Sequence, residues 1–453
     1  MNLAACPHRL ARGATAALAI AVVLALYGCA NMPPPEADDA YYMGDFRTAV
    51  ALVRPFENQF NNCFALNNVK LASVYMSAGA YGLAMEPLVR SGKTMERTVT
   101  GFRYALASIL TREDTKEFKG EPFERVMCHY YRGVLHYRNG DYERALAAFR
   151  RALDADRDTQ NKEDPATKTR DFRPLYFLAA RCYAQLGEYD NADACMRHFS
   201  GGADDTSVYG GNTLLVVEWG HGPVKKRTGY GDYKISITPQ VNSVVSAAVL
   251  VDSNEVLRLS SCVSLTAQAA DNNNTSVGFV QSAKASTKFT VQASAAVATA
   301  IVVGYYADPV SAAAAAAAAF YVAGLVVRAE ADDRIWNLLP EHVSVATATI
   351  PAGFHDIAIL YYNSAGDEIP ELREVFYRYP ITTGENLVYA RPTFARFGQY
   401  EYSSEEMKNT LLESYLKNTT YLRVPAENKD VIRIVPTPPV IQVPNKIKNL
   451  TLM

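Results

Sequence analysis

Few side chains in this sequence have both the type and the spacing that chemistry requires. Cys195 and His198 are one helical turn apart and would supply half of a metal site. His129 and His136 lie seven residues apart on one helical face, without a third ligand nearby in the sequence. The motifs G-x-S-x-G, H-E-x-x-H and G-x-x-x-x-G-K-[ST] do not occur. We therefore expect no metal site, no cofactor and no enzymatic activity.

A short run of cations interrupts an otherwise balanced charge distribution. The 453 residues are 20% charged with a net charge of −2, which gives no support to nucleic-acid binding. Lys225, Lys226 and Arg227 stand in the glycine-rich stretch 221–233. Two interpretations stay open: a contact for a phosphate or an acidic partner, or a solvated hairpin loop.

The phrase Gly-x-aromatic-x-x-Ala begins at Gly44, Gly79, Gly140 and Gly187. The first two copies are 35 residues apart, close to the tetratricopeptide period of about 34. The later intervals are longer and contain polar, proline-broken insertions. The flanking residues resemble tetratricopeptide positions, with a glycine that caps one helix in a left-handed conformation and an aromatic residue that starts the next. The small residues Gly133, Ala145 and Ala152 suit a close helix crossing.

Stacked helix pairs form a solenoid whose first helices line a concave face. We expect this solenoid over residues 39–200, and a groove on its third and fourth repeats. Aromatic and arginine side chains in such a groove typically anchor a peptide partner. The alternative is that they pack against the C-terminal half of the chain. The residues are Tyr130, Tyr137, Arg138, Phe177, Arg181 and Gln185.

In the second half of the chain, apolar and polar residues alternate with a period of two. Strands are predicted at 212–220, 233–239 and 255–260, and again after residue 340. A tight turn at Ala352-Gly353 is expected to join one strand to a returning strand. This pattern predicts an antiparallel β-sandwich-like domain over 212–440. The fold class is then α+β and multidomain: an all-α tetratricopeptide-like solenoid, followed by the sandwich with an inserted apolar helical hairpin.

The expected insertion covers about 277–334. Between residues 289 and 327 the sole charge is Asp308, which divides the run into two apolar halves. A helix of 18 residues spans roughly 27 Å, nearly the thickness of a bilayer core. Three interpretations compete: a buried hairpin, a membrane-inserted hairpin, and an oligomer-forming hairpin.

Residues 1–28 have the basic start and short apolar core of a secretory signal peptide. The core ends in Leu-Tyr-Gly-Cys, which resembles a bacterial lipobox and predicts lipidation of Cys29. The proline-rich stretch 29–38 would form a tether. Cys182 and Cys195, in one predicted helix pair, would be either bridged or buried as small apolar residues.

The mature chain resembles a family of bacterial outer-membrane lipoproteins that carry tetratricopeptide repeats and have no assigned activity. The resemblance rests on the lipobox and on residues 116–153, 220–226 and 331–353. It implies attachment to the outer membrane, on the periplasmic side, and supplies no catalytic residues.

Two functional hypotheses follow. The first is a non-enzymatic, lipid-anchored scaffold or adaptor that binds a periplasmic or envelope protein through the solenoid groove. The alternative is an envelope component that inserts into the membrane or oligomerises through the apolar segment 289–327.

Overall fold

The computed structural model describes residues 31–97, 116–157, 171–203, 205–228, 234–240, 242–272 and 332–392, and two short strands at 421–425 and 432–436. Three of the sequence predictions lie outside these ranges: the signal peptide, the lipidation of Cys29 and the apolar run 289–327. Within the described ranges, no helix has both the length and the apolar character needed to cross a membrane.

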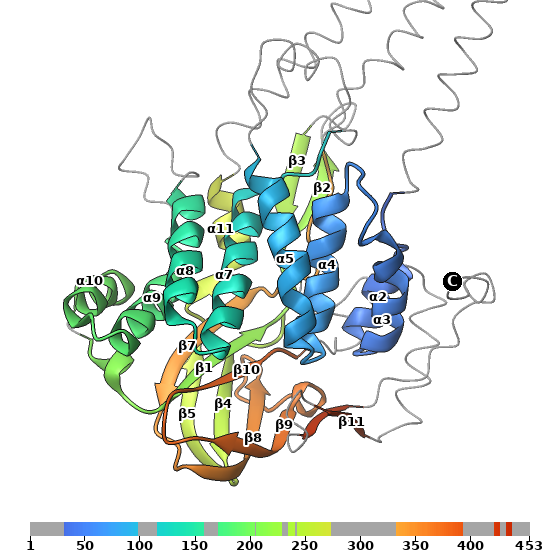
Figure 1. Ribbon diagram of the computed structural model, residues 1–453. Helices are drawn as coiled ribbons and strands as arrows, with labels where there is room; N and C mark the ends of the chain where they lie inside the picture. The colour runs from blue at the N-terminus through green and yellow to red at the C-terminus, as the bar shows by residue number, and fades with distance from the viewer. Residues whose placement is uncertain are drawn as a thin grey trace, which may run out of the picture.

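The N-terminal half folds into four antiparallel helix pairs, as the repeated phrase predicts. They are α2 (Glu36–Tyr42) with α3 (Phe46–Val53), α4 (Phe64–Ser77) with α5 (Tyr81–Glu96), α7 (Pro122–Arg138) with α8 (Tyr142–Arg157), and α9 (Pro174–Gln185) with α10 (Tyr189–Ser200). Figure 1 shows the pairs side by side, with the strands β1, β4, β5 and β7–β10 below them. Because α2 begins at Glu36 and buries Ala37 and Asp39, the predicted tether 29–38 is too long.

The glycines at the four joints, the turns between the two helices of each pair, confirm the predicted left-handed caps. Gly44, Gly79, Gly140 and Gly187 have φ angles between +73° and +78°, where a side chain would be strained. Gly133 is required for a different reason. A Cβ atom there would lie 2.3 Å from the ring of Phe149, so the crossing of α7 and α8 has no room for even a methyl group.

The strands of the second half form two main sheets. One has the order β10-β1-β7-β6 and the other β11-β12-β9-β8-β4-β5, while β2 and β3 form a separate two-stranded sheet. A small helix, α11 (Leu265–Asn272), follows β6. The strands are β1 (Thr213–Trp219), β2 (Val224–Thr228), β3 (Lys234–Thr238), β4 (Ser246–Val251), β5 (Asn254–Ser260), β6 (Val263–Ser264), β7 (His342–Ala348), β8 (Gly353–Tyr362), β9 (Glu374–Ile381), β10 (Asn386–Ala390), β11 (Tyr421–Pro425) and β12 (Ile432–Pro436).

Two details of the sandwich differ from the sequence prediction. The turn at Ala352-Gly353 does not form a hairpin, because β7 pairs with β1 whereas β8 pairs with β4 and β9. The turn instead carries the chain from one sheet to the other. The sandwich is also not wholly antiparallel, since β1 and β10 run parallel.

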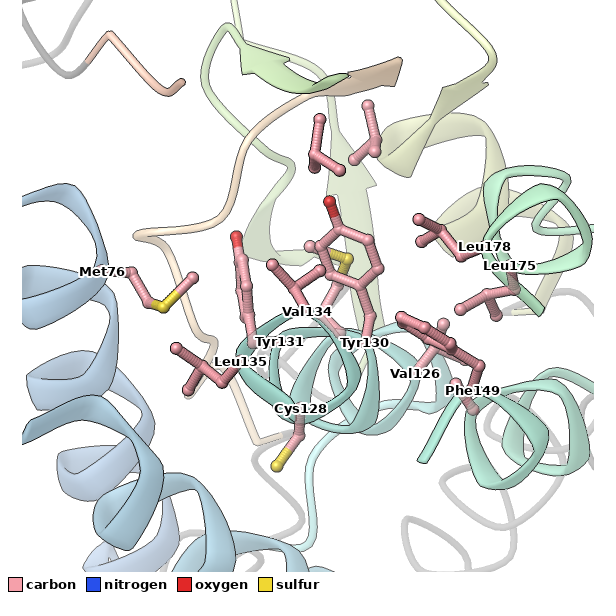
Figure 2. Packing of buried hydrophobic residues seen from close by; sticks show 14 of the residues in the cluster. Met76, Val126, Cys128, Tyr130, Tyr131, Val134, Leu135, Phe149, Leu175 and Leu178 are labelled. Carbon is pink, nitrogen blue, oxygen red and sulfur yellow. The ribbon is translucent and has the colours of Figure 1, made fainter. Parts of the chain in front are cut away.

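The four-stranded sheet is the middle of three layers. All seven residues of β1 are buried. Leu214 and Val216 face the helices and share a core with α4, α7 and α9, whereas Leu215 and Val217 face the six-stranded sheet. A strand buried on both faces reads as an unbroken apolar run, as the letters LLVV show. Helices and sheet therefore share one continuous apolar core, part of which is seen in Figure 2.

Candidate functional site

The six residues predicted to line the groove do lie on the first helices of the third and fourth pairs. Tyr130, Tyr137 and Arg138 come from α7, and Phe177, Arg181 and Gln185 from α9. Four of them have almost no exposed surface: 0% for Tyr130, 3% for Tyr137, 1% for Phe177 and 3% for Arg181. The sequence placed these residues on the correct face, but that face is covered.

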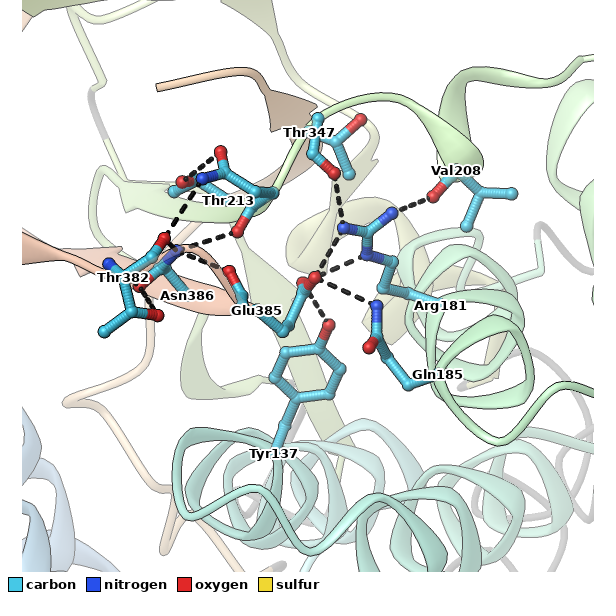
Figure 3. Close-up of polar contacts among 12 residues, drawn as sticks. Tyr137, Arg181, Gln185, Val208, Thr213, Thr347, Thr382, Glu385 and Asn386 are labelled. Carbon is cyan, nitrogen blue, oxygen red and sulfur yellow. Dashed lines mark hydrogen bonds and ion pairs between the residues drawn. The ribbon is translucent and has the colours of Figure 1, made fainter. Parts of the chain in front are cut away.

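A glutamate from the sheet side occupies the centre of the expected groove. The carboxylate of Glu385, the residue directly before β10, accepts hydrogen bonds from the Tyr137 hydroxyl at 2.5 Å and the Gln185 amide at 2.9 Å. It forms an ion pair with Arg181, whose terminal nitrogen lies 2.5 Å away. Figure 3 shows these groups converging on the carboxylate. The remaining Arg181 donors go to the carbonyls of Val208 and Gly211.

The other groove residues pack within the chain as well. The Tyr130 ring lies against Tyr131, and Phe177 packs on Phe199. The Arg138 guanidinium lies 4.2 Å from the centre of the Tyr81 ring. The prediction of an open partner-binding groove is therefore wrong. Tyr137, Arg181 and Gln185 pack against the C-terminal half through Glu385, as the alternative states, whereas Tyr130, Phe177 and Arg138 contact other residues of the solenoid. The physical reason is that the sheet buries its apolar face on the solenoid and brings Glu385 with it.

A buried polar cluster next to this contact was missed by sequence reasoning. Glu218 of β1 is 0% exposed and accepts hydrogen bonds from the hydroxyls of Tyr131 and Tyr389 at 2.9 and 3.0 Å. The Arg391 guanidinium lies 3.7 Å from its carboxylate and also donates to Tyr131. Burial raises the pKa of Glu218, and the nearby Arg391 charge opposes that shift. The sequence did contain a signal for this cluster, namely a glutamate inside an apolar run, because a buried charge needs a partner.

An extended segment, residues 332–341, crosses the same concave face, and we call it the strap. The Trp336 indole donates to the Ser73 hydroxyl of α4 at 2.8 Å, and its backbone amide donates to Glu124 of α7. Burial raises the pKa of Glu124 to about 7. Arg334, in the last residues of the predicted insertion 277–334, donates to the carbonyl of Asn62. The strap and the sheet together fill the concave face.

The cation run predicted as an anionic contact has a partner inside the protein. The Lys225 ammonium of β2 lies 2.6 Å from the Glu121 carboxylate at the start of α7 and donates to the carbonyl of Arg334. Its side chain is only 3% exposed, so it cannot receive an external anion. Lys226 is exposed, and the side chain of Arg227 lies outside the described residues. The pairing of β2 with β3 agrees with a hairpin, but the three cations lie in strand β2 and not in its loop, and Lys225 is not solvated.

The candidate metal ligands do not assemble. In the part of the chain that the structure describes, no three His, Cys, Asp or Glu side chains are grouped so that they could hold a metal ion. The His198 ring stacks on Tyr176, and His129 contacts Glu96 at 2.8 Å. Cys182 and Cys195 are both free thiols, so the interpretation that a disulfide joins them is wrong.

A serine and a histidine do meet at the surface, but not as a nucleophile and its base. The Ser261 hydroxyl lies 2.9 Å from Nδ1 of His342. The same hydroxyl donates its proton to the carbonyl of Val263 at 2.9 Å. Because a hydroxyl has one proton, the imidazole is left to donate to Ser261 rather than to accept from it. This arrangement holds β6 against β7.

The open surface lies beside the last helix pair. Two hollows, of about 890 and 410 Å³, meet at Ala194 and His198 of α10, and we call them together the α10 cleft. The larger hollow lies between α10 and the β6–α11 segment, and the smaller is lined by α8, α9 and α10. The polar and charged residues of the lining include Arg150, Asp154, Arg157, Asp171, Arg173, Asn191, Arg197, His198, Ser261 and Ser264.

The charge of the α10 cleft is mainly positive. Arg150, Arg157, Arg173 and Arg197 outnumber the two aspartates of the lining. Arg150 lies over the Tyr183 ring, 5.3 Å from its centre, which orients the guanidinium. Across the described ranges, none of these four arginines forms an ion pair with a carboxylate. Arg150 donates to the Tyr183 hydroxyl, which is neutral and leaves the guanidinium charge uncompensated. Guanidinium groups without a carboxylate partner around a hollow favour a negatively charged occupant.

Comparison with known proteins identifies the repeats. Residues 126–159 and 174–199 match tetratricopeptide repeat family models, so the chain contains tetratricopeptide repeats. These segments correspond to the third and fourth helix pairs. A comparison with curated proteins gives no match.

Solved structures of the MamA protein are similar to part of the chain. Two of them share 16% identity, cover 37% of this chain and 68% and 73% of theirs, and superpose with TM-scores of 0.25. A third, MamA AMB-1, shares 14% identity, covers 37% of this chain and 95% of its own, and has a TM-score of 0.20. With scores this low, the assignment of the repeats rests on the family models and on the helix pairs themselves.

Proposed function

We propose that this protein is a non-enzymatic scaffold, anchored to the outer membrane by a lipid on Cys29, that binds a periplasmic partner protein through the α10 cleft. Tetratricopeptide repeats supply the class of function, which is binding of another protein. The observation that carries the proposal is the contrast between two surfaces of the repeats. The concave face is filled by the strap and the sheet, whereas the α10 cleft is open and lined by arginines that have no ion-pair partner among the described residues.

The position of α10 supports this choice of surface. It is the last helix of the solenoid and buries only Ala192 and Met196. Tyr189, at its first position, is 60% exposed. A helix that ends a stack has one face without a helical neighbour. The two hollows run along that helix, so an occupant would contact α8, α9 and α10 together.

The chemistry of the α10 cleft favours an extended segment rich in Asp and Glu. Guanidinium groups bind carboxylates with paired, charge-assisted hydrogen bonds. The Tyr176 and Tyr183 side chains line the smaller hollow together with Arg150 and Arg157 and supply apolar area. Tyrosine and arginine are the residue types that contribute most to protein interfaces.

Photocrosslinking in cells of the source organism tests the proposal. We expect p-benzoylphenylalanine at Asn191, in the α10 cleft, to give a discrete crosslinked product. The control position is Leu83 of α5, which is 59% exposed and far from the cleft. Arg150→Glu combined with Arg197→Glu should abolish the product, whereas Arg144→Glu, also on α8 with a side chain 75% exposed, should not. Equal crosslinking from Asn191 and Leu83 would show that the α10 cleft is not the binding surface.

The lipid anchor has a separate test. Modification of a lipobox cysteine adds more than one acyl chain, enough for stable attachment. We expect the native protein to fractionate with the outer membrane and Cys29→Ser to lose that attachment. Recovery of the native protein with the inner membrane or the soluble fraction contradicts this part of the proposal.

A further inference from the structure

The described chain starts at one end of the solenoid. The Asn31 side chain donates to the side-chain oxygen of Asn62 at 3.0 Å, and the Asn31 carbonyl accepts from the Asn67 side chain at 2.9 Å. Asn62 lies two residues before the start of α4, so these bonds fix Asn31 at the N-terminal end of that helix. Figure 1 shows this end of α4 pointing away from β8 and β9 of the six-stranded sheet.

The same end of the molecule carries exposed apolar side chains. Phe60, two residues before Asn62, is 88% exposed, the largest fraction among the exposed large apolar residues of the described ranges. Its ring stacks on Phe64 with centroids 4.8 Å apart, which holds it in a fixed direction. Met32, next to Asn31, is 38% exposed. We call residues 57–62 together with Met32 the Phe60 surface.

The charges around the Phe60 surface are paired with one another. Arg90 contacts Glu57 at 3.2 Å and Glu86 at 2.5 Å. Lys119, in the segment that hydrogen-bonds to the Asn62 carbonyl through Phe118, lies 2.7 Å from Glu117. Each of these described charges thus has a partner of opposite sign, and the exposed aromatic ring is the dominant feature of the Phe60 surface among the described residues.

We propose that the Phe60 surface lies against the lipid bilayer, with the Phe60 ring in the interfacial region. The inference rests on the lipid anchor proposed above. Only Ala30 separates Asn31 from Cys29, and two residues of extended chain span at most about 7 Å. The interfacial region on each side of the hydrocarbon core is about 5–8 Å thick. A lipid on Cys29 thus holds the Phe60 surface at the bilayer, and phenylalanine is among the side chains with which interfacial proteins contact the boundary of headgroups and acyl chains.

In this orientation one end of the protein contacts the membrane while a different surface stays available to bind the partner. The six-stranded sheet lies at the far end of the molecule, and α10 lies on the side away from α2 and α3 (Figure 1). The α10 cleft is then not covered by the bilayer. An exposed phenylalanine that would be a liability in water also becomes a second membrane contact beside the lipid.

Fluorescence quenching on the full mature chain tests the orientation. The two native tryptophans, Trp219 and Trp336, are 0% and 1% exposed, so an indole added at the surface can be distinguished from them. Phe60→Trp places an indole on the proposed membrane surface. Phe354→Trp is the matched control, because Phe354 is 57% exposed on β8 in the six-stranded sheet. The lipidated variants are bound to phosphatidylcholine vesicles that contain brominated acyl chains.

We expect brominated lipid to quench at least half of the emission added by Phe60→Trp and none of that added by Phe354→Trp. Replacing part of the lipid with phosphatidylglycerol should not change this ratio, because the surface charges are paired. If the protein floats with the vesicles and the Phe60→Trp indole is not quenched, the orientation is refuted while the anchor stands. That result includes the case in which another part of the chain, or a second copy, covers Phe60. If the lipidated protein does not float with the vesicles, the anchor itself is wrong.

Discussion

The ion pair between Arg181 and Glu385 offers a direct test of whether the concave face is structural. Both side chains are nearly buried, with 4% and 6% of their surfaces exposed. Glu385→Ala leaves the Arg181 guanidinium and the Tyr137 hydroxyl without their common acceptor. Removing one partner of a buried ion pair typically costs about 3–5 kcal/mol, because the remaining charge stays desolvated. Even the lower figure reduces the ratio of folded to unfolded protein by about two powers of ten.

The measurement is urea unfolding followed by far-ultraviolet circular dichroism on four variants. Glu385→Ala and Arg181→Met should each lower the free energy of unfolding by the amount stated. The double variant Glu385→Leu with Arg181→Met should recover most of the loss, because an apolar pair of similar volume avoids desolvation. Glu255→Ala, which breaks the exposed Arg258–Glu255 pair, is the control and should leave the midpoint unchanged.

An open binding groove predicts the opposite behaviour. Its arginine would be solvated before a partner arrives, so loss of Glu385 would not matter to folding. If Glu385→Ala unfolds within about 0.5 kcal/mol of the native protein, as surface substitutions do, the contact is not a structural one. The concave face would then have to be reconsidered as the partner site.

Three further predictions concern packing, pH and thiol reactivity. Gly133→Ala should lower the free energy of unfolding by about 1–3 kcal/mol in urea titrations, because the new methyl group collides with Phe149. Burial lowers the pKa of His221 to about 4. In the unfolded chain the pKa of this histidine has its usual value near 6.5, so below pH 6.5 the unfolded state takes up the proton before the folded state does. The stability present above pH 6.5 is therefore lost as the pH falls toward 4. At pH 5 the loss in the free energy of unfolding is about 2 kcal/mol. His221→Gln should remove that part of the pH dependence of the urea midpoint. Burial raises the pKa of Cys128 to about 12 and that of Cys182 further still, so mass spectrometry should show maleimide labelling of both only after unfolding.

The parts of the fold that were predictable from the sequence are those set by neighbours along the chain. Each helix joint depends on a glycine and the aromatic residue two places later, and all four joints formed as predicted. The strand β1 was equally clear, because its apolar run is local. The strand pairing was not predictable, since β1 joins β10 in parallel across more than 150 residues. No local pattern distinguishes a turn within one sheet from the turn at Ala352-Gly353, which passes between two.

The candidate site failed for a related reason. Tyr137, Arg181 and Gln185 have the residue types of a binding groove, and their positions on the helices were correct. Their partner Glu385 is 204 residues from Arg181 and lies in a turn that carries no special signal. A better signal was present in β1, where Glu218 interrupts an apolar run. A carboxylate in that position requires buried donors, and the tyrosines of α7 are among them.

Residue type alone therefore cannot tell a surface that binds a partner from one that binds the rest of its own chain. Both use tyrosine and arginine on the first helices of a repeat, and both supply a carboxylate to the arginine. What separates them is whether the chain already contains the opposite charge within hydrogen-bond distance. Arg181 has Glu385, and Lys225 has Glu121, so those cations are already neutralised. The arginines of the α10 cleft have no such carboxylate among the described residues. By the criterion that excludes the concave face as a binding site, the α10 cleft is the surface at which we expect a partner to bind.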